Sequence, residues 1–184
     1  MTLDSWRTRL IADYARMRPG SRFSISRFLI TCLGNPGLVA ATLLRLQELC
    51  VVNNKHRMAA FLRTLALKWT GADFLPGCQA GPGLLMHHPN GIVLGAGSRL
   101  GKNCTILQQV TLGERYANGL GPSTYPTLGD NVTIGAGAKV LGGVMIGDGV
   151  QVGANSVVLS DLPPGATAVG APARAVQPKH QTGT

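Results

Sequence analysis

Aliphatic residues recur at every sixth position along the second half of the chain. Two frames share this spacing, and the residue after each aliphatic position is usually glycine. The first frame contains Leu94, Leu100, Ile106 and Leu112, and the second contains Leu128, Ile134, Val140, Ile146, Val152 and Val158. A short fixed period with one buried aliphatic and one small turn residue is typical of a parallel β-solenoid, in which stacked coils bury what a single repeat cannot. The pattern therefore predicts a mainly β fold over residues 72–176.

The break between the two frames predicts a loop. Leu112 and Leu128 are sixteen residues apart, so a segment within 113–125 must leave the solenoid as an excursion. Its many glycines and polar residues suit an exposed loop rather than a strand. Insertions in repeat arrays often carry binding chemistry, which makes this loop a candidate part of a functional site.

Residues 1–71 carry a different pattern, which predicts a helical region. The segment Pro36–Cys50 is rich in helix formers, with Asn35 available as N-cap and proline at the first helical position. A further helix is expected over Lys55–Leu67, where apolar and basic residues are interspersed. We interpret both segments as amphipathic helices that pack on the end of the solenoid.

The positive charge of the chain is concentrated in this helical region. The formal net charge is +9: residues 1–71 contribute +8 and residues 72–184 contribute +1. A basic amphipathic surface also suits an anionic membrane, and Trp6, Phe23 and Phe28 lie close to arginines in the sequence, so peripheral membrane contact stays open as an alternative. Nucleic acid is not an expected partner, because no binding motif accompanies the charge.

Targeting signals and cysteine spacing indicate the compartment. No apolar run reaches transmembrane length, and the first ten residues lack the apolar stretch of a signal peptide, so we expect a cytoplasmic protein. The spacing of Cys32, Cys50, Cys78 and Cys104 matches neither a metal site nor a secreted disulfide framework. We expect these cysteines to be reduced and mostly buried, and residues 177–184 to form a flexible tail.

Two adjacent histidines lie at a second irregularity of the repeat. Met86 and Leu94 are eight residues apart, and the additional residues fall around His87 and His88. Neighbours on an extended segment point to opposite faces, so a zinc pair is disfavoured, and no Cys, Asp or Glu is close enough in sequence to complete a ligand set. Taken alone, either histidine is more often structural than catalytic.

Four segments occur in consistent order between positions 73 and 176. They are Asp73–Pro76, MHHPNGIVLG, ILQQVTLG, and the long run from PTLGDNVTIGAGAKVLGG to LPPGATAVGAPARAV. In these segments the chain resembles the hexapeptide-repeat acyltransferases, and within them the serine O-acetyltransferase group. The resemblance implies a left-handed parallel β-helix of triangular section, a homotrimer with active sites at subunit interfaces, and acetyl-CoA as acyl donor, with no metal.

The resemblance also implies a catalytic pair. His88 corresponds to the family's catalytic histidine and Asp73 to the carboxylate that pairs with it. A hydroxyl attacks a thioester poorly unless its proton is removed, and histidine titrates close enough to neutral pH to act as the base. A carboxylate on the other ring nitrogen orients the imidazole and stabilises its charged form. Transfer would be direct, in a ternary complex with no covalent enzyme intermediate.

Cofactor contacts are implied at small residues and at nearby cations. Small side chains let a ligand approach the backbone, but they also serve as solenoid corners. Exposed cations are candidates for the phosphates of CoA, although such charges are usually only solvated. The residues implied are Gly113, Gly135, Ala136, Lys139, Gly153, Ala154 and Arg174.

The acceptor site departs from the serine-using pattern. The family's acid before the catalytic histidine is His87 here, and the family's Arg-His pair at the end of the loop is Thr124-Tyr125. The two residues expected to bind the ammonium and carboxylate groups of a free amino acid are therefore altered, although Arg115 on the loop could still hold a carboxylate. Tyr125 suits a sugar or polyol acceptor, or it is a loop anchor packed at the subunit interface.

These observations give three functional hypotheses. The first is an acetyl-CoA-dependent O-acetyltransferase acting on a hydroxyl of a small molecule or saccharide unit. The second is a serine O-acetyltransferase of cysteine biosynthesis. The third is a non-catalytic scaffold, which the presence of both Asp73 and His88 disfavours.

Overall fold

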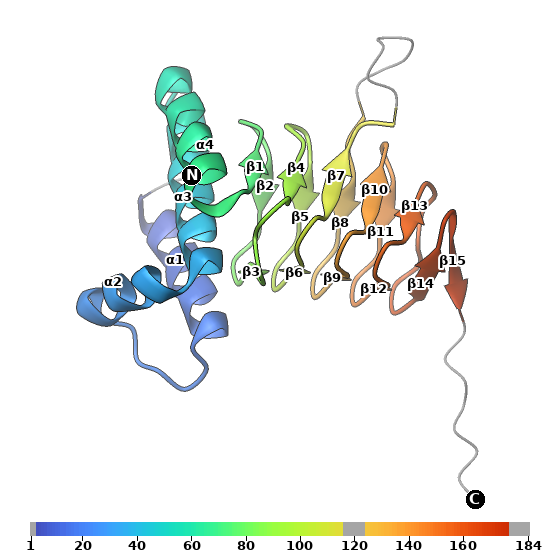
Figure 1. The fold of residues 1–184 in the computed structure, drawn as a ribbon, viewed down its shortest axis with the longest axis horizontal. Coiled ribbons are helices and arrows are strands. Elements are labelled where there is room, and N and C mark those ends of the chain that lie inside the picture. The colour runs from blue at the N-terminus through green and yellow to red at the C-terminus, as the bar shows by residue number, and fades with distance from the viewer. Residues whose placement is uncertain (1–2, 116–123, 177–184) are drawn as a thin grey trace, which may run out of the picture.

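The chain forms a helical region followed by a solenoid of short strands (Figure 1). The computed structural model describes residues 3–115 and 124–176. The excursion residues 116–123 and the tail expected over 177–184 therefore lie outside the described residues. Within the described ranges the helices are α1 (Leu3–Met17), α2 (Ile25–Gly34), α3 (Pro36–Val52) and α4 (His56–Thr70). They stand at one end of the solenoid, and the final strand stands at the other.

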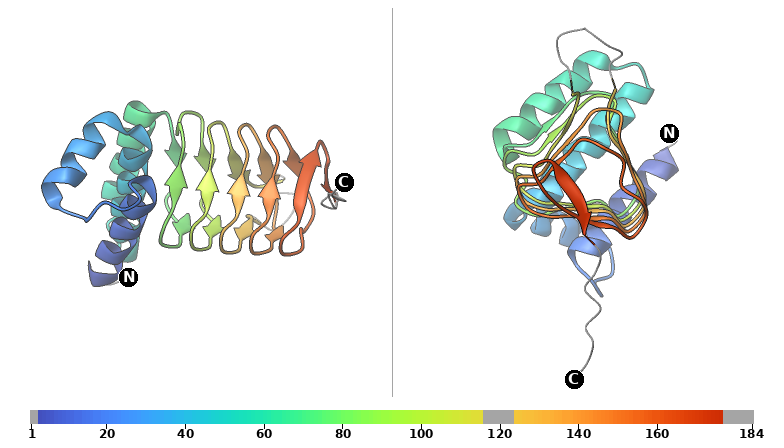
Figure 2. Two further views of the ribbon diagram at one scale, coloured as in Figure 1. Left: turned by 90° about the horizontal axis from the view of Figure 1, so that it is seen from below. Right: turned by 90° about the vertical axis from the view of Figure 1, so that its right-hand side faces the viewer.

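The strands belong to three sheets, which form the sides of a three-sided coil (Figure 2). The first sheet contains β1 (Asp73–Phe74), β4 (Val93–Leu94), β7 (Thr111–Gly113), β10 (Lys139–Leu141) and β13 (Val157–Val158). The second contains β2 (Gln79–Ala80), β5 (Arg99–Leu100), β8 (Thr127–Leu128) and β11 (Met145–Ile146). The third contains β3 (Leu85–Met86), β6 (Thr105–Ile106), β9 (Thr133–Ile134), β12 (Gln151–Val152), β14 (Thr167–Gly170) and β15 (Ala173–Val176). Paired strands are parallel except β14 and β15.

The six-residue period sets which side chains fill the solenoid. Successive residues of a strand point to opposite faces, and the second residue of each short strand faces inward. All ten aliphatic positions of the two frames are exposed by 6% or less. The predicted solenoid core is therefore confirmed position by position.

Both interruptions of the period are present as longer coils. An ordinary coil advances the strand register by eighteen residues, as in the pairing of Val93 with Thr111. The first coil advances it by twenty, from Asp73 to Val93, and the two additional residues lie in the turn after β3. The coil with the excursion advances it by twenty-eight, from Thr111 to Lys139. Its ten additional residues fall between β7 and β8, where the sequence predicted them.

Local signals explain the boundaries of α3 and α4. The Asn35 side chain accepts a hydrogen bond from the Leu38 backbone N–H at 2.9 Å, which caps the start of α3 as predicted. Helix α4 ends at Gly71, which adopts a left-handed φ of +71°. A Cβ at position 71 would also lie 2.7 Å from Oδ1 of Asn90. Glycine therefore allows the chain to turn directly from α4 into the first coil.

Buried charged side chains join the helices to the open edge of the first coil. Strands β1, β2 and β3 lie at the ends of their sheets, which leaves backbone groups without strand partners. Arg45 of α3 is fully buried and donates to both carboxylate oxygens of Asp13, to Glu48 and to the Ala80 oxygen. In turn Asp13 accepts from the Leu84 N–H and Glu48 from the Ala80 N–H, each at 2.7 Å. The ion network therefore supplies the missing strand partners.

Part of the concentrated positive charge has this structural use. Arg9 donates to the Ala80 oxygen at 3.1 Å. Arg16 donates to the oxygens of Gly83 and Asn103 at 3.0 and 2.6 Å. These contacts confirm that the helices pack on the end of the solenoid.

The cysteines are free thiols, as expected. Cys78 and Cys104 are buried, whereas Cys32 and Cys50 are half-buried. Burial raises the pKa of the Cys78 thiol to about 12 and that of Cys104 to about 11. The two buried thiols therefore stay protonated at neutral pH.

Candidate active site

One edge of the three-sided coil collects most of the residues that the sequence singles out. This edge joins the third sheet to the first and is built from the turns 87–91, 107–110, 135–138 and 153–156; we call it the histidine edge. Backbone hydrogen bonds stack these turns in a single column. They run from Gln109 N–H to the Asn90 oxygen (3.0 Å), from Gly137 N–H to the Gln108 oxygen (2.8 Å) and from Asn155 N–H to the Ala136 oxygen (2.8 Å).

His88 lies in the first of these turns, and its side chain is exposed. Its backbone has a left-handed φ of +51°, which is uncommon outside glycine. The next residue, Pro89, is buried, so the turn is anchored in the core beside the exposed ring. His87 is exposed as well. The expectation that the two rings point to opposite faces assumed an extended chain, and a left-handed His88 does not meet that condition.

Asp73 lies on β1, next to the turn that carries His88. Its backbone N–H donates to the Ile92 oxygen at 2.8 Å, and the Gly91 N–H donates to the Gly71 oxygen at 2.9 Å. The Asp73 carboxylate, however, is held from the other side by Arg63 of α4. Across the described residues, no hydrogen bond joins Asp73 to the ring of His88. Their pairing therefore stays a prediction.

Arg63 is the site residue that sequence reasoning missed. It donates from Nε to one carboxylate oxygen of Asp73 and from Nη2 to the other, the second at 2.8 Å. These hydrogen bonds raise the pKa of the guanidinium above its ordinary value. The sequence offered no signal beyond a cation on an amphipathic helix, because the contact depends on the sharp turn at Gly71.

The implied cofactor residues of small size lie further along the histidine edge. Ala136 is half-exposed and Ala154 is exposed. Gly135 is also required by the packing of the coils, because a Cβ there would lie 2.7 Å from the Ala154 nitrogen. Likewise, a Cβ at Gly153 would lie 2.7 Å from Cγ1 of Val169. Coil stacking explains both glycines, and ligand approach is the added role that the two alanines can serve.

The implied cations lie in the later coils. Lys139 begins β10 and donates from Nζ to the Gly137 oxygen at 2.5 Å. Arg174 of β15 is exposed and pairs in register with Val169. Gly113 ends β7 opposite Leu141 rather than lying in a turn of the histidine edge.

The residues that flank the excursion lie at the other side of the first sheet. Arg115 and Thr124 lie beside two glycines of the next coil. A Cβ added at Gly142 would lie 3.3 Å from the Arg115 side chain, and one added at Gly143 would lie 3.0 Å from the Thr124 side chain. The ring of Tyr125 lies against Gly95 and Gly97. Tyr125 therefore packs as a loop anchor in its own chain. The excursion follows β7, whereas His88 precedes β4, so a single chain does not bring Arg115 or Tyr125 together with His88 at one edge.

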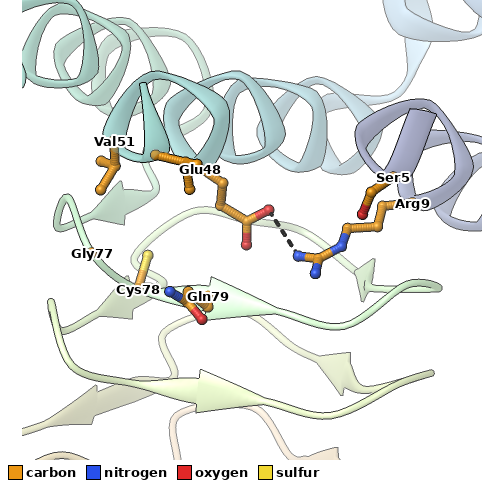
Figure 3. Close-up of a pocket in the computed structure, with 8 residues that line it drawn as sticks. Ser5, Arg9, Glu48, Val51, Gly77, Cys78 and Gln79 are labelled. Carbon is orange, nitrogen blue, oxygen red and sulfur yellow. Dashed lines mark ion pairs between the residues drawn. The ribbon is translucent and has the colours of Figure 1, made fainter. Parts of the chain in front are cut away.

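A separate cavity lies between the helices and the first coil (Figure 3). It measures about 210 Å³, and an ion pair between Arg9 and Glu48 (3.6 Å) crosses it beside Cys78. The protonated thiol of Cys78 and the paired charges give it no reactive group, so we assign it to the junction between helices and solenoid. Among the described residues, no cluster of three His, Cys, Asp or Glu side chains could hold a metal ion.

Comparison with known proteins identifies the architecture and the chemistry. The family model described as "Bacterial transferase hexapeptide (six repeats)" matches residues 125–160. The serine acetyltransferase of Helicobacter pylori strain J99 is 43% identical over 144 residues, which are 77% of this chain and 81% of that protein. A soybean serine acetyltransferase apoenzyme superposes with a TM-score of 0.83 at 37% identity, covering 94% of this chain and 69% of that one. The soybean enzyme complexed with serine gives 0.82 at 38% identity, with 94% and 70% coverage.

These similarities confirm the expected left-handed parallel β-helix with an N-terminal helical region. They extend across the helices as well as the repeats, because the superpositions cover 94% of the chain. They also exclude the scaffold hypothesis, since the relatives are named as enzymes. The chain is an acyltransferase and belongs to the serine acetyltransferase family of hexapeptide-repeat proteins.

Proposed function

We propose that this chain is a serine O-acetyltransferase, which moves the acetyl group of acetyl-CoA to the serine hydroxyl in the route to cysteine. The observation that carries the proposal is the 43% identity to a serine acetyltransferase over 81% of that protein's length. The similar soybean enzyme complexed with serine supports the same acceptor. The sequence alone favoured other hydroxyl acceptors, and the comparisons reverse that order.

In the proposed reaction His88 acts as general base. The imidazole takes the proton of the serine hydroxyl while the oxygen attacks the thioester carbonyl. The tetrahedral intermediate then collapses, the carbon–sulfur bond breaks, and the imidazolium returns the proton to the CoA thiolate. The products are O-acetylserine and CoA, so atoms and charges balance. The exposed ring on an anchored turn supports this role, because the base must meet substrate from solvent.

In this proposal the carboxylate of Asp73 orients the His88 imidazole, and Arg63 in turn holds the carboxylate of Asp73. An ionised carboxylate accepts several hydrogen bonds, so the two that Arg63 donates leave lone pairs for an imidazole N–H. A bidentate guanidinium also fixes the plane of the carboxylate. Arg63 is therefore a positioning residue in this proposal.

The histidine edge suits the extended arm of acetyl-CoA. Neighbouring strands lie about 4.8 Å apart, so Ala136, two coils from His88, is about 10 Å along the edge, and Ala154 about 14 Å. An acyl donor that lies along this column places its thioester beside His88 and its phosphates toward Lys139 and Arg174. The small side chains leave the backbone accessible to the arm.

A complete site in this proposal needs two chains. Arg115 and Tyr125 lie at the opposite side of the first sheet from His88, so they reach a histidine edge only in a neighbouring protomer. The homotrimer that the family resemblance implies supplies this arrangement. The placement of the excursion supports active sites that are shared between protomers.

A second candidate acceptor is a sugar, polyol or other hydroxyl compound without the charges of an amino acid. The observation that favours it is His87, which stands where an acid would receive the ammonium group of serine. Thr124 likewise replaces the arginine expected to bind the carboxylate.

The deciding experiment measures release of free CoA thiol from acetyl-CoA with a panel of acceptors. Serine should give the highest kcat/KM, and the His88→Ala variant should remove turnover with every acceptor. A sugar or polyol that exceeds serine would replace the proposed acceptor with the second candidate. If no hydroxyl compound supports release beyond background hydrolysis, the acetyltransferase proposal fails as a whole.

A further inference from the structure

Helix α2 presents an apolar face to the outside of the molecule. Ile25, Leu29, Ile30 and Leu33 are 73, 58, 65 and 89% exposed. Their spacing places them on one side of the ten-residue helix, whereas Thr31 is buried on the other side. The helix lies at the end of the molecule farthest from β15 (Figures 1 and 2). The α2 face, defined by these four side chains, is therefore a protruding apolar surface.

An aromatic cluster fixes this face in its outward orientation. The rings of Tyr14, Phe23 and Phe28 are 5.4 to 6.1 Å apart and join α1 to the start of α2. Tyr14 is buried, so the cluster is rooted in the helical region. The exposure of the α2 face is a property of the packed fold.

Arginines surround the α2 face. Arg18 and Arg27 line a shallow hollow with Ile30, and Arg7 lines a second hollow of about 240 Å³ with Ile25. The remaining walls of the second hollow are apolar, namely Trp6, Leu10, Ile11, Phe23 and Phe28. The sequence contains no acidic residue between Asp13 and Glu48. Between residues 14 and 47 every charged side chain is cationic, so the face combines exposed aliphatic side chains with a basic border.

We propose that the α2 face docks on an anionic lipid bilayer. Aliphatic side chains on a convex helix can enter the headgroup region, while flanking arginines extend to lipid phosphates. Each cation close to an anionic surface adds to the attraction. This composition and shape suit a helix that lies in a membrane interface.

The charges disfavour a second copy of the chain as the occupant. Two α2 faces in contact would bring their arginine borders together, and the segment between Asp13 and Glu48 has no acid to offset them. An anionic membrane offers the opposite charge across its whole surface. Charge complementarity therefore selects the lipid.

The helix would lie in the interface rather than cross the bilayer. Within the described chain, no single helix is long and apolar enough to span a membrane, and α2 with α3 passes that test only as a pair bent by 117°. Much of α3 is committed to the protein, since Leu44, Arg45 and Glu48 are buried at the first coil. Helix α4 also exposes apolar side chains, including Met58, Phe61 and Trp69, and α2 carries the exposed apolar face at the outer end of the molecule.

Flotation of the full chain with lipid vesicles tests the proposal. Binding is expected to vesicles of phosphatidylcholine mixed with phosphatidylglycerol, and not to phosphatidylcholine alone. Added salt should weaken it, because the flanking arginines are exposed. Absence of binding to the anionic vesicles at low salt would overturn the proposal, whichever acceptor the enzyme uses.

Paired variants distinguish binding through the α2 face from nonspecific electrostatic or hydrophobic adsorption. Leu29→Ser/Leu33→Ser should reduce binding roughly tenfold or more, and Arg18→Gln/Arg27→Gln should reduce it by a similar factor. Met145→Ser, a 56% exposed apolar residue on β11, and Lys102→Gln, an exposed cation in the solenoid, are the matched controls and should bind normally. Turnover of acetyl-CoA in solution should be unchanged in all four.

Molar mass by light scattering identifies the competing occupant. If Leu29→Ser/Leu33→Ser lowers the oligomeric state but leaves vesicle binding intact, the face is an interface between copies, and the lipid proposal is wrong. Unchanged mass with lost vesicle binding supports it. Equal loss in the Met145→Ser control would show nonspecific adsorption and also count against the proposal.

Discussion

Arg63 holds both carboxylate oxygens of Asp73, the residue that the family resemblance pairs with the catalytic base. The pair links α4 to the first strand of the solenoid, so the helical region reaches the candidate active site directly. Arg63→Ala should free the carboxylate to turn away from the histidine edge. We expect kcat to fall roughly fivefold, equivalent to about 1 kcal/mol for a partly exposed ion pair. KM for acetyl-CoA should change little.

The Arg63→Lys variant is the informative control. It keeps the charge but lacks the planar fork, so it should recover only part of the lost kcat. The pH–rate profile of Arg63→Ala should shift as well, because the charge beside the orienting carboxylate is gone. Unchanged kcat and profile in the alanine variant would assign the ion pair to stability alone.

Loss of the base should remove chemistry but not donor binding. His88→Ala is expected to lower kcat by about 10² to 10⁴, the usual contribution of a positioned general base. Calorimetry should show acetyl-CoA binding close to that of the native chain, since the exposed ring at position 88 contributes little to the fold. His87→Ala is the neighbouring control, and equal inactivation of both variants would contradict the assignment of the base to His88.

Asp73→Asn tests the orienting role independently. The amide keeps the shape of the side chain but cannot stabilise an imidazolium, so kcat should fall and its dependence on pH should change. Circular dichroism should show an intact fold. A native pH–rate profile in this variant would mean that Asp73 serves only the ion pair with Arg63.

The buried arginine that joins the helices to the solenoid should be critical for stability. Arg45→Ala leaves Asp13 as a buried acid without its partner and Glu48 with only the longer contact to Arg9, and breaking a buried ion pair typically costs about 3–5 kcal/mol. Urea denaturation should show this loss, and Arg57→Ala, an exposed arginine on α4, should fall within about 0.5 kcal/mol of the native chain. A small effect at Arg45 would mean that the coil edge finds other partners.

The buried thiols should resist alkylation and make the fold sensitive to alkaline pH. Iodoacetamide at about pH 8 should leave Cys78 and Cys104 unmodified until urea is added, because burial raises their pKa to about 12 and about 11. Both folded-state pKa values lie above the ordinary thiol pKa of about 9. The buried thiols therefore contribute fully to stability below about pH 9, and this contribution is lost as the pH rises toward the folded-state pKa.

Thermal unfolding across alkaline pH tests the predicted loss of stability. The midpoint should fall above about pH 9, and the fall should be smaller in Cys78→Ala, which lacks one of the two groups. A midpoint that declines equally in both chains would assign the alkaline sensitivity to other groups.

The sequence predicted the solenoid well because each coil repeats the same pattern of one buried aliphatic residue and one small turn residue per six positions. One buried aliphatic position per strand gave the register, and a gap of sixteen residues between Leu112 and Leu128 located the excursion. The helix start at Asn35 was equally readable, because its cap is formed within four residues.

Contacts between distant elements were less accessible to sequence reasoning. The Arg63–Asp73 pair depends on how sharply the chain turns at Gly71, which no period encodes. The left-handed backbone at His88 was also not predicted, although His, like the residue type at Asn103, Asn131 and Asn155, adopts this conformation more often than most residues. Side-chain pairing between helix and coil, and the backbone conformation of a single turn, therefore needed the structure.

Closure of the solenoid at both ends has a consequence for assembly. Parallel strands with free edges can recruit further copies and polymerise into a fibre. Here the helices bond to the first coil, and the antiparallel strand β15 covers the last parallel strand of the third sheet, so among the described residues that sheet ends without a free parallel edge. End-to-end stacking along the axis is therefore disfavoured, which directs any association of protomers to their flanks, where a cleft shared between chains can form.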